Sequence, residues 1–310
     1  MLITRGFESA RAASRGCVVA IGNFDGLHLG HQAIIARLAE RSREMRLPAA
    51  VLAFEPHPRE YFAPQEAPAR LMRLRDKAEM LETAGVSMLR VLRFGAALSA
   101  WDGVTFIERI LDFALGAKQV VIGAGFRYGH GRGGDVTLLR AEGARRGFGV
   151  DELPPQDLGG ERVSSTRVRT ALAAGRLDEA RALLGRDYRI SGRVIEGTRL
   201  GRRLGFPTAN IRLHRRASPV AGIFATRVSG AGPERLPAVA SVGTRPTVGG
   251  VEMILEVHLF DFDGELYGRR LAVDFIARLR DEVHYPDLAT MIAQMHRDAS
   301  QARQLLGTRG

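Results

Sequence analysis

The first half of this 310-residue chain alternates short apolar runs with stretches of helical spacing. The apolar runs are CVVAIG, AAVLAFEP, SMLRVLRF and QVVIGAGF, and a helical stretch follows each of them, beginning with QAIIARLAERSREMR. Strands separated by single helices form βαβ units and a parallel sheet. Ligands of such sheets bind beyond the carboxyl ends of the strands. Four polar segments fall at those ends, GNFDGLHLGH, FEPHP, RFG and GAGFRYGHGRGGD. The pattern therefore predicts an α/β domain with a ligand site at this edge.

The second half has a different texture, which begins near Arg186. Short β-like runs are split by Gly and Pro, which is typical of an antiparallel barrel or sandwich. The segment from residue 164 to Gly185 predicts a helical connection, and the last segment of the chain predicts an amphipathic helix. The apolar residues expected to face a core from that last helix are Leu288, Ile292, Met295, Leu305 and Leu306. We therefore expect two domains, residues 1–185 and residues 186–310.

Composition limits the classes of protein that need considering. The net charge is +11, but all basic residues except Lys77 and Lys118 are arginines, scattered and interleaved with acids. Neither a dense basic face nor a helix-turn-helix is visible, so we expect no nucleic-acid partner. The single cysteine, Cys17, excludes an internal disulfide and is typical of a reducing compartment. No window reaches the 18 apolar residues of a membrane span. We expect the first strand to begin near Cys17. A soluble, cytoplasmic protein is predicted.

The decapeptide GNFDGLHLGH, residues 22–31, lies between a predicted strand and a predicted helix. A helix N-terminus offers unpaired N–H groups and the positive end of a dipole, so anions bind there. His28 and His31 are three residues apart on the first turn and can reach one phosphate chain. Gly26 and Gly30 allow close approach of the backbone. These residues predict a site that stabilises a charged phosphorus transition state. The two histidines could instead bind zinc, but no third ligand is fixed nearby.

This decapeptide resembles the H-x-G-H signature of nucleotidylyltransferases, and VSSTRVR at 163–169 resembles their second phosphate-binding signature. Together with FEPHP and GRGGD, they resemble the FMN adenylyltransferase half of bacterial bifunctional riboflavin kinase/FAD synthetases, whose N-terminal domain is Rossmann-like. The resemblance implies the following ATP and phosphate ligands: Asn23, Asp25, His28, Gly30, His31, Ser165, Thr166 and Arg169. Gly125 departs from the family, which usually carries Asn or Asp there.

The segment GRVIEGTRLGRRLGFPTANI, residues 192–211, is rich in glycine and ends in Pro-Thr-Ala-Asn. Thr208 and Asn210 alternate, so on a strand they share one face, where two oxygens can meet one hard cation. A Gly-rich arch with Arg202 can lie over a polyphosphate. Taken alone, the segment also fits a hairpin with glycine turns.

GFPTAN, SVGTRPT and LEVHLFDFDGELYG, in this order, resemble a complete riboflavin kinase module. The resemblance implies that Glu256 is the catalytic base for the ribityl hydroxyl. It places Mg²⁺ and phosphate on Thr208 and Asn210, and the ATP loop on Gly197 and Arg202. LRDEVHY resembles the flavin-facing loop and implies flavin contacts from Arg280 and Tyr285. We expect a structural or supporting role for His258, which shares the strand face of Glu256.

The two resemblances span nearly the whole chain and imply one bifunctional enzyme. We therefore expect a Rossmann-like α/β domain with a parallel sheet, followed by a small antiparallel β-barrel with a terminal helix. It would convert riboflavin and ATP to FMN, and FMN and ATP to FAD and pyrophosphate, with Mg²⁺. Two alternatives stay open: a riboflavin kinase whose adenylyltransferase half has decayed at Gly125, and a flavin-sensing nucleic-acid-binding regulator. The sequence leaves the oligomeric state open.

Overall fold

The computed structural model describes residues 1–6, 16–197, 201, 204–213, 217–247 and 250–307. These residues form two compact units. The first contains residues 1–68 and 73–164, and the second contains residues 69–72 and 165–310. The expected boundary after residue 185 remains a prediction.

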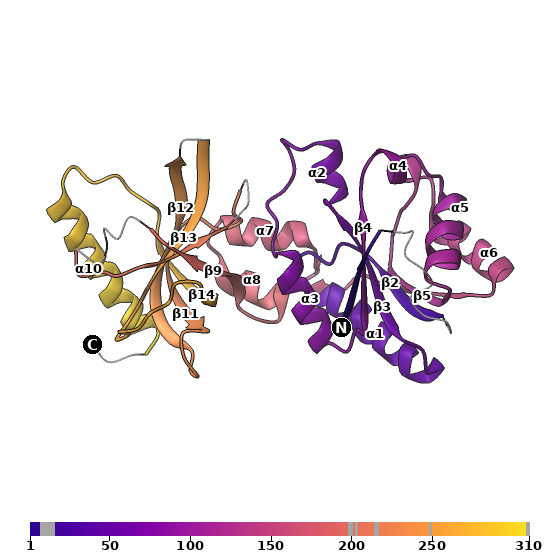
Figure 1. Cartoon of the computed structure of the whole chain (residues 1–310), viewed down its shortest axis with the longest axis horizontal. Helices are drawn as coiled ribbons and strands as arrows, with labels where there is room; N and C mark the ends of the chain where they lie inside the picture. The colour runs from indigo at the N-terminus through magenta and orange to yellow at the C-terminus, as the bar shows by residue number, and fades with distance from the viewer. Residues whose placement is uncertain (7–15, 198–200, 202–203, 214–216, 248–249, 308–310) are drawn as a thin grey trace. The chain divides into compact units, whose positions relative to one another are not determined.

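The first unit is built on a six-stranded sheet in which all neighbouring strands are parallel. Its strands are β1 (Leu2–Arg5), β2 (Cys17–Ile21), β3 (Ala49–Glu55), β4 (Met88–Arg93), β5 (Ala117–Gly123) and β6 (Gly149–Leu153). Their spatial order is β1-β4-β3-β2-β5-β6. The order reverses beside β2, so the loop after β2 opens at a switch point of the sheet, where such folds bind ligands. The predicted α/β class is confirmed (Figure 1).

Every residue of β2 is buried, and alternate residues of a strand point to opposite faces of the sheet. Both faces therefore need cover, which helices supply. The helical segments are α1 (Leu29–Met45), α2 (Pro58–Phe62), α3 (Leu74–Thr83), α4 (Ala96–Ser99), α5 (Gly103–Phe106), the π-helix η1 (Ile107–Ala114), the 3₁₀ turn η2 (His130–Arg132) and α6 (Val136–Arg146). Helix α1 packs on β2, β3 and β5. A core cluster joins η1 and α6 to the sheet through residues such as Ile107, Ile110 and Leu139.

Two strands of the sheet were missing from the expectation. The prediction that the first strand begins near Cys17 is wrong, because β1 (Leu2–Arg5) pairs in parallel with β4. At the other edge, β6 (Gly149–Leu153) pairs with β5. Both are short edge strands, and neither is fully buried, so neither has the continuous apolar run that marks the central strands. A two-stranded ribbon, β7 (Asp157–Leu158) and β8 (Glu161–Arg162), follows β6.

The second unit is a closed antiparallel barrel, as predicted, with strand order β10-β13-β12-β11-β14-β9. Its strands are β9 (Tyr188–Ile195), β10 (Ala209–Arg212), β11 (Gly222–Ser229), β12 (Leu236–Thr247), β13 (Gly250–Leu259) and β14 (Arg270–Arg280). Buried Leu255, Val257 and Leu259 alternate along β13 with the more accessible Glu256 and His258. The barrel interior is therefore apolar, and the opposite face of β13 carries the polar side chains.

Two helices precede the barrel in this unit, α7 (Ser165–Ala173) and α8 (Leu177–Leu184). Gly185 ends α8 in the left-handed conformation, with φ of 69°, at the expected position. Helix α8 packs on β9 and β14 and buries Leu183 and Leu184. The predicted helical connection is confirmed.

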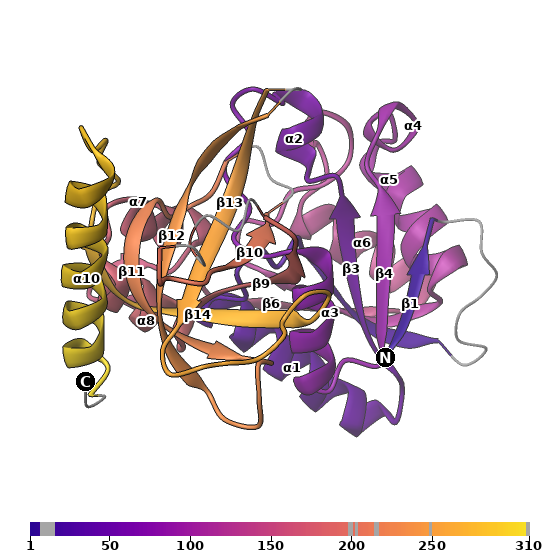
Figure 2. The same ribbon diagram turned by 60° about the vertical axis from the view of Figure 1, so that its left-hand side comes forward.

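The terminal helix α10 (Leu288–Leu305) runs beside the barrel strands β11, β12 and β14 (Figure 2). Its predicted apolar face is partly wrong, because Leu288 and Leu305 are exposed whereas Leu306 is buried. The residues buried on the helix are Asp298 and Ala302. Asp298 replaces an apolar residue on the packed face since its carboxylate binds the Arg280 guanidinium, with Nη2–Oδ2 at 2.6 Å. An ion pair thus occupies a position on the packed face, where hydrophobic periodicity leads one to expect an apolar side chain.

Candidate active sites

The loop between β2 and α1 is tightly wound. Gly26 has a φ of 83°, and two residues with side chains, Phe24 and Leu27, also adopt positive φ angles of 49° and 44°. Such conformations cost free energy, and they persist where the surrounding structure holds them in place. The Gln32 Nε2 donates to the Leu27 carbonyl at 2.8 Å. Helix α1, which follows the turn and contains Gln32, therefore holds the turn at Leu27.

His28 is the N-cap of α1, and its Nδ1 accepts the backbone N–H of His31 at 3.3 Å. In the neutral ring, the proton of His28 therefore sits on Nε2. The rings of His28 and His31 stack with centroids 3.7 Å apart. The sequence prediction that both side chains act together at the first helical turn fits this geometry.

Burial lowers the pKa of His31 well below its ordinary value, and the neighbouring His28 and Lys77 lower it further. Its Nδ1 is buried and has no hydrogen-bond partner among the described residues. A bound polyanion would raise the pKa of His31 again, because negative charge favours the protonated imidazole. It would also accept a hydrogen bond from Nδ1. The histidine pair is therefore a candidate site for an anionic ligand.

The other loop residues support the same site. The Asn23 Oδ1 is buried without a hydrogen-bond partner in the described part of the chain, and Asp25 is buried. At Gly30, a Cβ would lie 3.2 Å from the Cε1 of His28 and 3.3 Å from its Nδ1. A side chain there would push the His28 ring from its capping position. Gly30 therefore preserves the histidine geometry.

A cavity of about 300 Å³ adjoins the two histidines. Its walls come from α1, from the end of β5, from the segment after β6 and from the chain just before α7. The lining residues are His28, Gly30, His31, Ile34, Gly123, Ala124, Pro154, Pro155, Gln156, Arg162, Val163 and Ser164. The cavity thus lies at the carboxyl ends of β5 and β6, where a parallel sheet binds nucleotides.

Gly125 directly follows Ala124, which lines this cavity, and has a φ of 75°. A Cβ at Gly125 would meet nothing within 4 Å. Asn and Asp tolerate this left-handed conformation better than other residues with side chains. The departure from the family pattern therefore changes a side chain in open space and leaves the backbone turn possible.

Ser165, Thr166 and Arg169 lie on α7 in the second unit. Ser165 begins the helix, and Thr166 is exposed in its first turn. The Arg169 Nε donates to the Ala69 carbonyl at 2.6 Å. This hydrogen bond anchors the Arg169 side chain within the second unit. Ser164, the residue before α7, belongs to the first unit and lines its cavity.

Sequence reasoning missed an aromatic cluster formed by Phe54, Tyr61, Phe62 and Phe94. Tyr61 and Phe62 belong to α2, and both meet Phe94, which directly follows β4, with ring centroids 5.7 Å and 5.6 Å away. Phe62 is 67% exposed. The sequence signal was present in FEPHP and EYF, but only the fold brings them to one edge of the sheet. A flat apolar ligand could stack there.

In the barrel unit, Thr208 directly precedes β10, and Asn210 lies within it. The Asn210 Nδ2 donates to the Thr208 carbonyl at 3.3 Å, which directs Oδ1 away as an acceptor. Gly197 lies against this amide, since a Cβ there would be 2.6 Å from Nδ2. Gly201 similarly lies near the Thr208 hydroxyl, 3.3 Å from its expected Cβ. Arg202, the other predicted ATP-loop residue, lies outside the described residues.

Glu256 pairs in register with Asn210 on β10 and with Ser241 on β12. Directly paired residues of antiparallel strands carry their side chains on the same face, with Cβ atoms about 5 Å apart. The predicted base and the predicted metal ligand therefore share one face of the barrel. Hydroxyl and amide oxygens such as those of Thr208 and Asn210 suit a hard divalent cation. The described residues contain no cluster of three or more His, Cys, Asp or Glu side chains that could hold a metal ion.

His258 is two residues beyond Glu256 on the same face. Its Nδ1 donates to the Pro207 carbonyl at 2.9 Å, and its ring packs against Phe206 with centroids 5.1 Å apart. Burial lowers its pKa, so the ring is neutral near pH 7. The contacts fit the expected supporting role, because they hold the segment that carries Thr208.

The predicted flavin contacts, Arg280 and Tyr285, lie at the end of β14 and in the loop after it. The Arg280 guanidinium binds Asp298 and lies 5.9 Å from the Tyr285 ring centroid. The Tyr285 hydroxyl is buried and has no hydrogen-bond partner among the described residues. Nearby, the Ser241 hydroxyl binds Glu282 at 3.1 Å, which brings this loop to the strand residue opposite Glu256.

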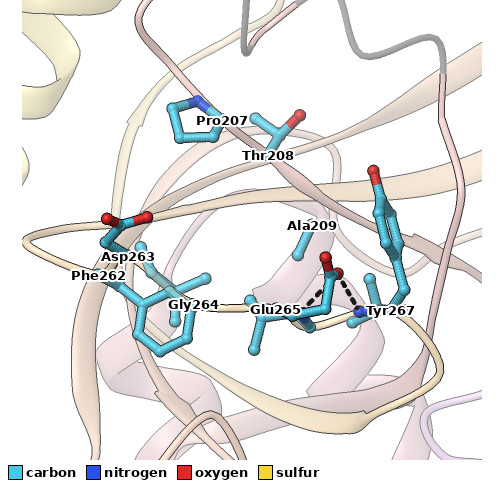
Figure 3. Close-up of a pocket in the computed structure, with 11 residues that line it drawn as sticks. Pro207, Thr208, Ala209, Phe262, Asp263, Gly264, Glu265 and Tyr267 are labelled. Carbon is cyan, nitrogen blue, oxygen red and sulfur yellow. Dashed lines mark hydrogen bonds between the residues drawn. The ribbon is translucent and has the colours of Figure 1, made fainter.

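A cavity of about 150 Å³ opens beside Thr208. Figure 3 shows Pro207 and Thr208 facing the segment from Phe262 to Tyr267 across it. The Glu265 carboxylate turns back and accepts the N–H groups of Leu266 and Tyr267, each at 3.1 Å. The segment DFDGELYG carries no motif that predicts a ligand cavity. Its position next to Thr208 makes it a candidate wall for a nucleotide.

The fold and the two sites define a nucleotidyltransferase-like α/β domain joined to a closed barrel with its own polar site. Two family models match the chain, "FAD synthetase" over residues 10–167 and "Riboflavin kinase" over residues 184–306. The curated bifunctional riboflavin kinase/FMN adenylyltransferase of Haemophilus influenzae is 44% identical, covering 98% of both chains. The protein of that name in Escherichia coli K12 is also 44% identical, covering 99% of this chain and 98% of its own. The chain belongs to the bifunctional riboflavin kinase/FMN adenylyltransferase family, which confirms the resemblance.

A solved structure from Streptococcus pneumoniae, titled as a macrolide-efflux protein, has a TM-score of 0.83 to this chain. It is 27% identical and covers 98% of this chain and 99% of its own. The two proteins share their fold over the full length. Among the described residues, no helix combines the length and apolar character needed to cross a lipid bilayer.

Proposed function

We propose that this chain phosphorylates riboflavin to FMN in its barrel unit and adenylylates FMN to FAD in its α/β unit, using ATP in both steps. The observation that carries the proposal is that each half matches a different catalytic family and contains its own polar site. One site is the stacked histidine pair beside a cavity. The other is the paired Glu256 and Asn210 on the barrel face.

For adenylylation, the FMN phosphate is already an anionic nucleophile, so no general base is required. The ATP phosphates would lie at the start of α1, where His28 donates from Nε2 and His31 gains a proton from the anionic environment. The motif residues Ser165, Thr166 and Arg169 are proposed to hold the leaving pyrophosphate. Alignment and charge neutralisation then supply most of the catalysis.

The flavin of the adenylyl acceptor needs an apolar surface near this edge of the sheet. The cluster of Phe54, Tyr61, Phe62 and Phe94 supplies one, and its most exposed ring is Phe62. Stacking on an aromatic ring would orient the isoalloxazine without fixing its phosphate. We assign this cluster to flavin binding in the adenylylation step.

For phosphorylation, Glu256 is proposed to remove the proton of the ribityl 5′-hydroxyl as the hydroxyl oxygen attacks the γ-phosphorus of ATP. The bond from that phosphorus to the β,γ-bridging oxygen breaks, and ADP leaves. Thr208 and Asn210 would hold the cation, which we propose to be Mg²⁺; when bound, it neutralises phosphate charge. The cavity beside Thr208 is proposed for the nucleotide, with Gly197 allowing close approach. Arg280 and Tyr285 would contact the flavin.

We also propose that the protein acts in the cytoplasm and without a nucleic-acid partner. The single buried cysteine and the interleaved arginines and acids support this setting. Weak retention on a DNA column at moderate salt would agree with it, and strong retention would favour the regulator alternative.

The direct test incubates the purified chain with riboflavin, ATP and Mg²⁺ and separates the flavins by chromatography. FMN should appear first and FAD should follow. FMN without FAD, also when FMN is supplied directly, would indicate a kinase whose adenylyltransferase half is inactive. Absence of both products would refute the proposal.

A further inference from the structure

Lys77 is a buried lysine that the predicted site does not include. It lies on α3 and is 7% exposed, and the other buried residues of that helix are Ala78 and Leu81. The other lysine of the chain, Lys118, is exposed on β5. Burying an ammonium group is costly unless it is hydrogen-bonded or paired, so its placement needs a reason. Its Nζ donates to the backbone carbonyl of Asn23, 54 residues earlier in the chain.

That carbonyl lies at the entrance of the strained turn that presents the histidines. Asn23 directly precedes Phe24, the first of the two residues with positive φ and a side chain. Leu27, the second, is held through its carbonyl by Gln32. Lys77 and Gln32 therefore hold the two ends of the turn from different helices, α3 and α1. Without the Lys77 contact, the first strained residue would have one restraint fewer.

Lys77 also brings positive charge to this loop. Together with burial, the largest cause, and with the neighbouring His28, it lowers the pKa of His31. A fixed ammonium group beside a phosphate site attracts the polyanion and stabilises added negative charge in the transition state. The charge lies in a buried setting, where solvent screens it less than at the surface.

We propose that Lys77 is a positioning residue for adenylylation, whose ammonium holds the Asn23 carbonyl so that the turn presents His28 and His31 to the phosphates of ATP. The inference rests on the proposed function of the α/β unit. A displacement of about 1 Å at a catalytic group costs about 100-fold in rate. Loss of the contact should therefore reduce FAD formation about 10- to 100-fold.

The test compares Lys77→Met, which keeps the length of the side chain, with the wild type and with Lys118→Met as the matched control. FAD formation from FMN is measured as kcat and as KM for ATP, and riboflavin phosphorylation is measured in the same preparation. We expect Lys77→Met to lose kcat for FAD formation about 10- to 100-fold, with a smaller change in KM. Riboflavin phosphorylation and both activities of Lys118→Met should stay at wild-type values.

Two further variants separate positioning from loss of folding. Lys77→Arg retains a cationic donor and should recover part of the lost kcat. Gln32→Leu removes the other restraint without burying or removing a charge, and should lower FAD formation selectively, even if Lys77→Met does not fold. Calorimetry of each variant reports the folded fraction of the α/β unit.

The possible failures are distinguishable. A wild-type chain that forms FMN but no FAD from supplied FMN would overturn the proposed adenylylation by the α/β unit. A folded Lys77→Met that forms FAD within threefold of the wild-type rate would overturn only the role of Lys77. A loss of kcat that merely follows the loss of the calorimetric transition, with no recovery in Lys77→Arg, would also overturn it.

Discussion

Gly197→Ala should impair the kinase site through one methyl group. The added Cβ would lie 2.6 Å from the Nδ2 and 2.9 Å from the Cγ of Asn210. Ordinary contacts between such atoms are about 3.5 Å or longer, so an overlap of almost 1 Å must be relieved. The Asn210 side chain has little room to retreat because the residue is only 7% exposed and lies between two paired strands.

The size of the effect follows from the cost of overpacking, which is about 1–3 kcal/mol. If this cost falls on the placement of the Asn210 amide, it appears in the transition state for phosphoryl transfer. At about 1.4 kcal/mol for each factor of ten, kcat/KM for riboflavin should fall about 5- to 150-fold. The cation concentration needed for half-maximal activity should rise as well, because the displaced amide is a proposed cation ligand.

The assay is riboflavin phosphorylation across a Mg²⁺ titration, with FAD formation from FMN as the internal reference. Gly232→Ala is the matched control in the same barrel, because that position is exposed and a Cβ there meets nothing within 4 Å. Its two activities should equal those of the wild type. If folded Gly197→Ala shows wild-type phosphorylation and an unchanged Mg²⁺ requirement, then Asn210 is not the cation ligand argued above.

Four other changes test separate parts of the molecule. Glu256→Gln should reduce FMN formation about 10²- to 10⁴-fold and spare FAD formation from FMN; near-normal phosphorylation would place the base elsewhere. His28→Ala should reduce FAD formation by about 10²- to 10³-fold and spare phosphorylation, whereas equal loss of both activities would contradict the two-site assignment. The depressed pKa of His31 means that the unfolded chain binds its proton more readily, so stability is lost as the pH falls below about 6.5. Urea unfolding should show a decrease of up to about 1.4 kcal/mol per pH unit, and a smaller one in His31→Asn; an unchanged slope would contradict this origin. Finally, a fragment of residues 165–310 should melt at a higher temperature than one of residues 186–310, since it retains the apolar contacts of α8; equal melting temperatures would support the boundary at 185.

The main features of both folds could be predicted because their signals are local. The buried runs of β2 to β5 and the glycines between barrel strands mark elements by residue type alone. Short edge strands such as β1 lack that signal, because only pairing with β4 identifies them as part of the sheet. The face of α10 was misjudged for a related reason. Asp298 is buried there only because Arg280 is its partner, 18 residues away.

The candidate sites show the same division between local motifs and distant contacts. The motifs around His28 and Glu256 could be recognised from spacing and resemblance. The contact of Lys77 with Asn23 spans 54 residues, and the aromatic cluster joins residues of α2 to Phe94 beyond β4. Neither contact has a periodicity or a motif, since each depends on how the strands are ordered in the sheet. Such residues become visible only when the fold is known.

The abundance of arginine in this chain has a consequence for its tolerance of alkaline and acidic media. Asp151 on β6 accepts Nε of Arg37 at 2.7 Å and Nε of Arg41 at 2.8 Å, both from α1. Burial raises the pKa of Asp151, but the hydrogen bonds of Arg41 and Arg37 outweigh it and leave that pKa below its ordinary value. A guanidinium keeps its charge at pH values where an ammonium loses it. The ion pairs of Arg37 and Arg41 with Asp151 therefore stay charged from mildly acidic to strongly basic solution. They join the edge strand β6 to α1, the helix that begins at the histidine pair.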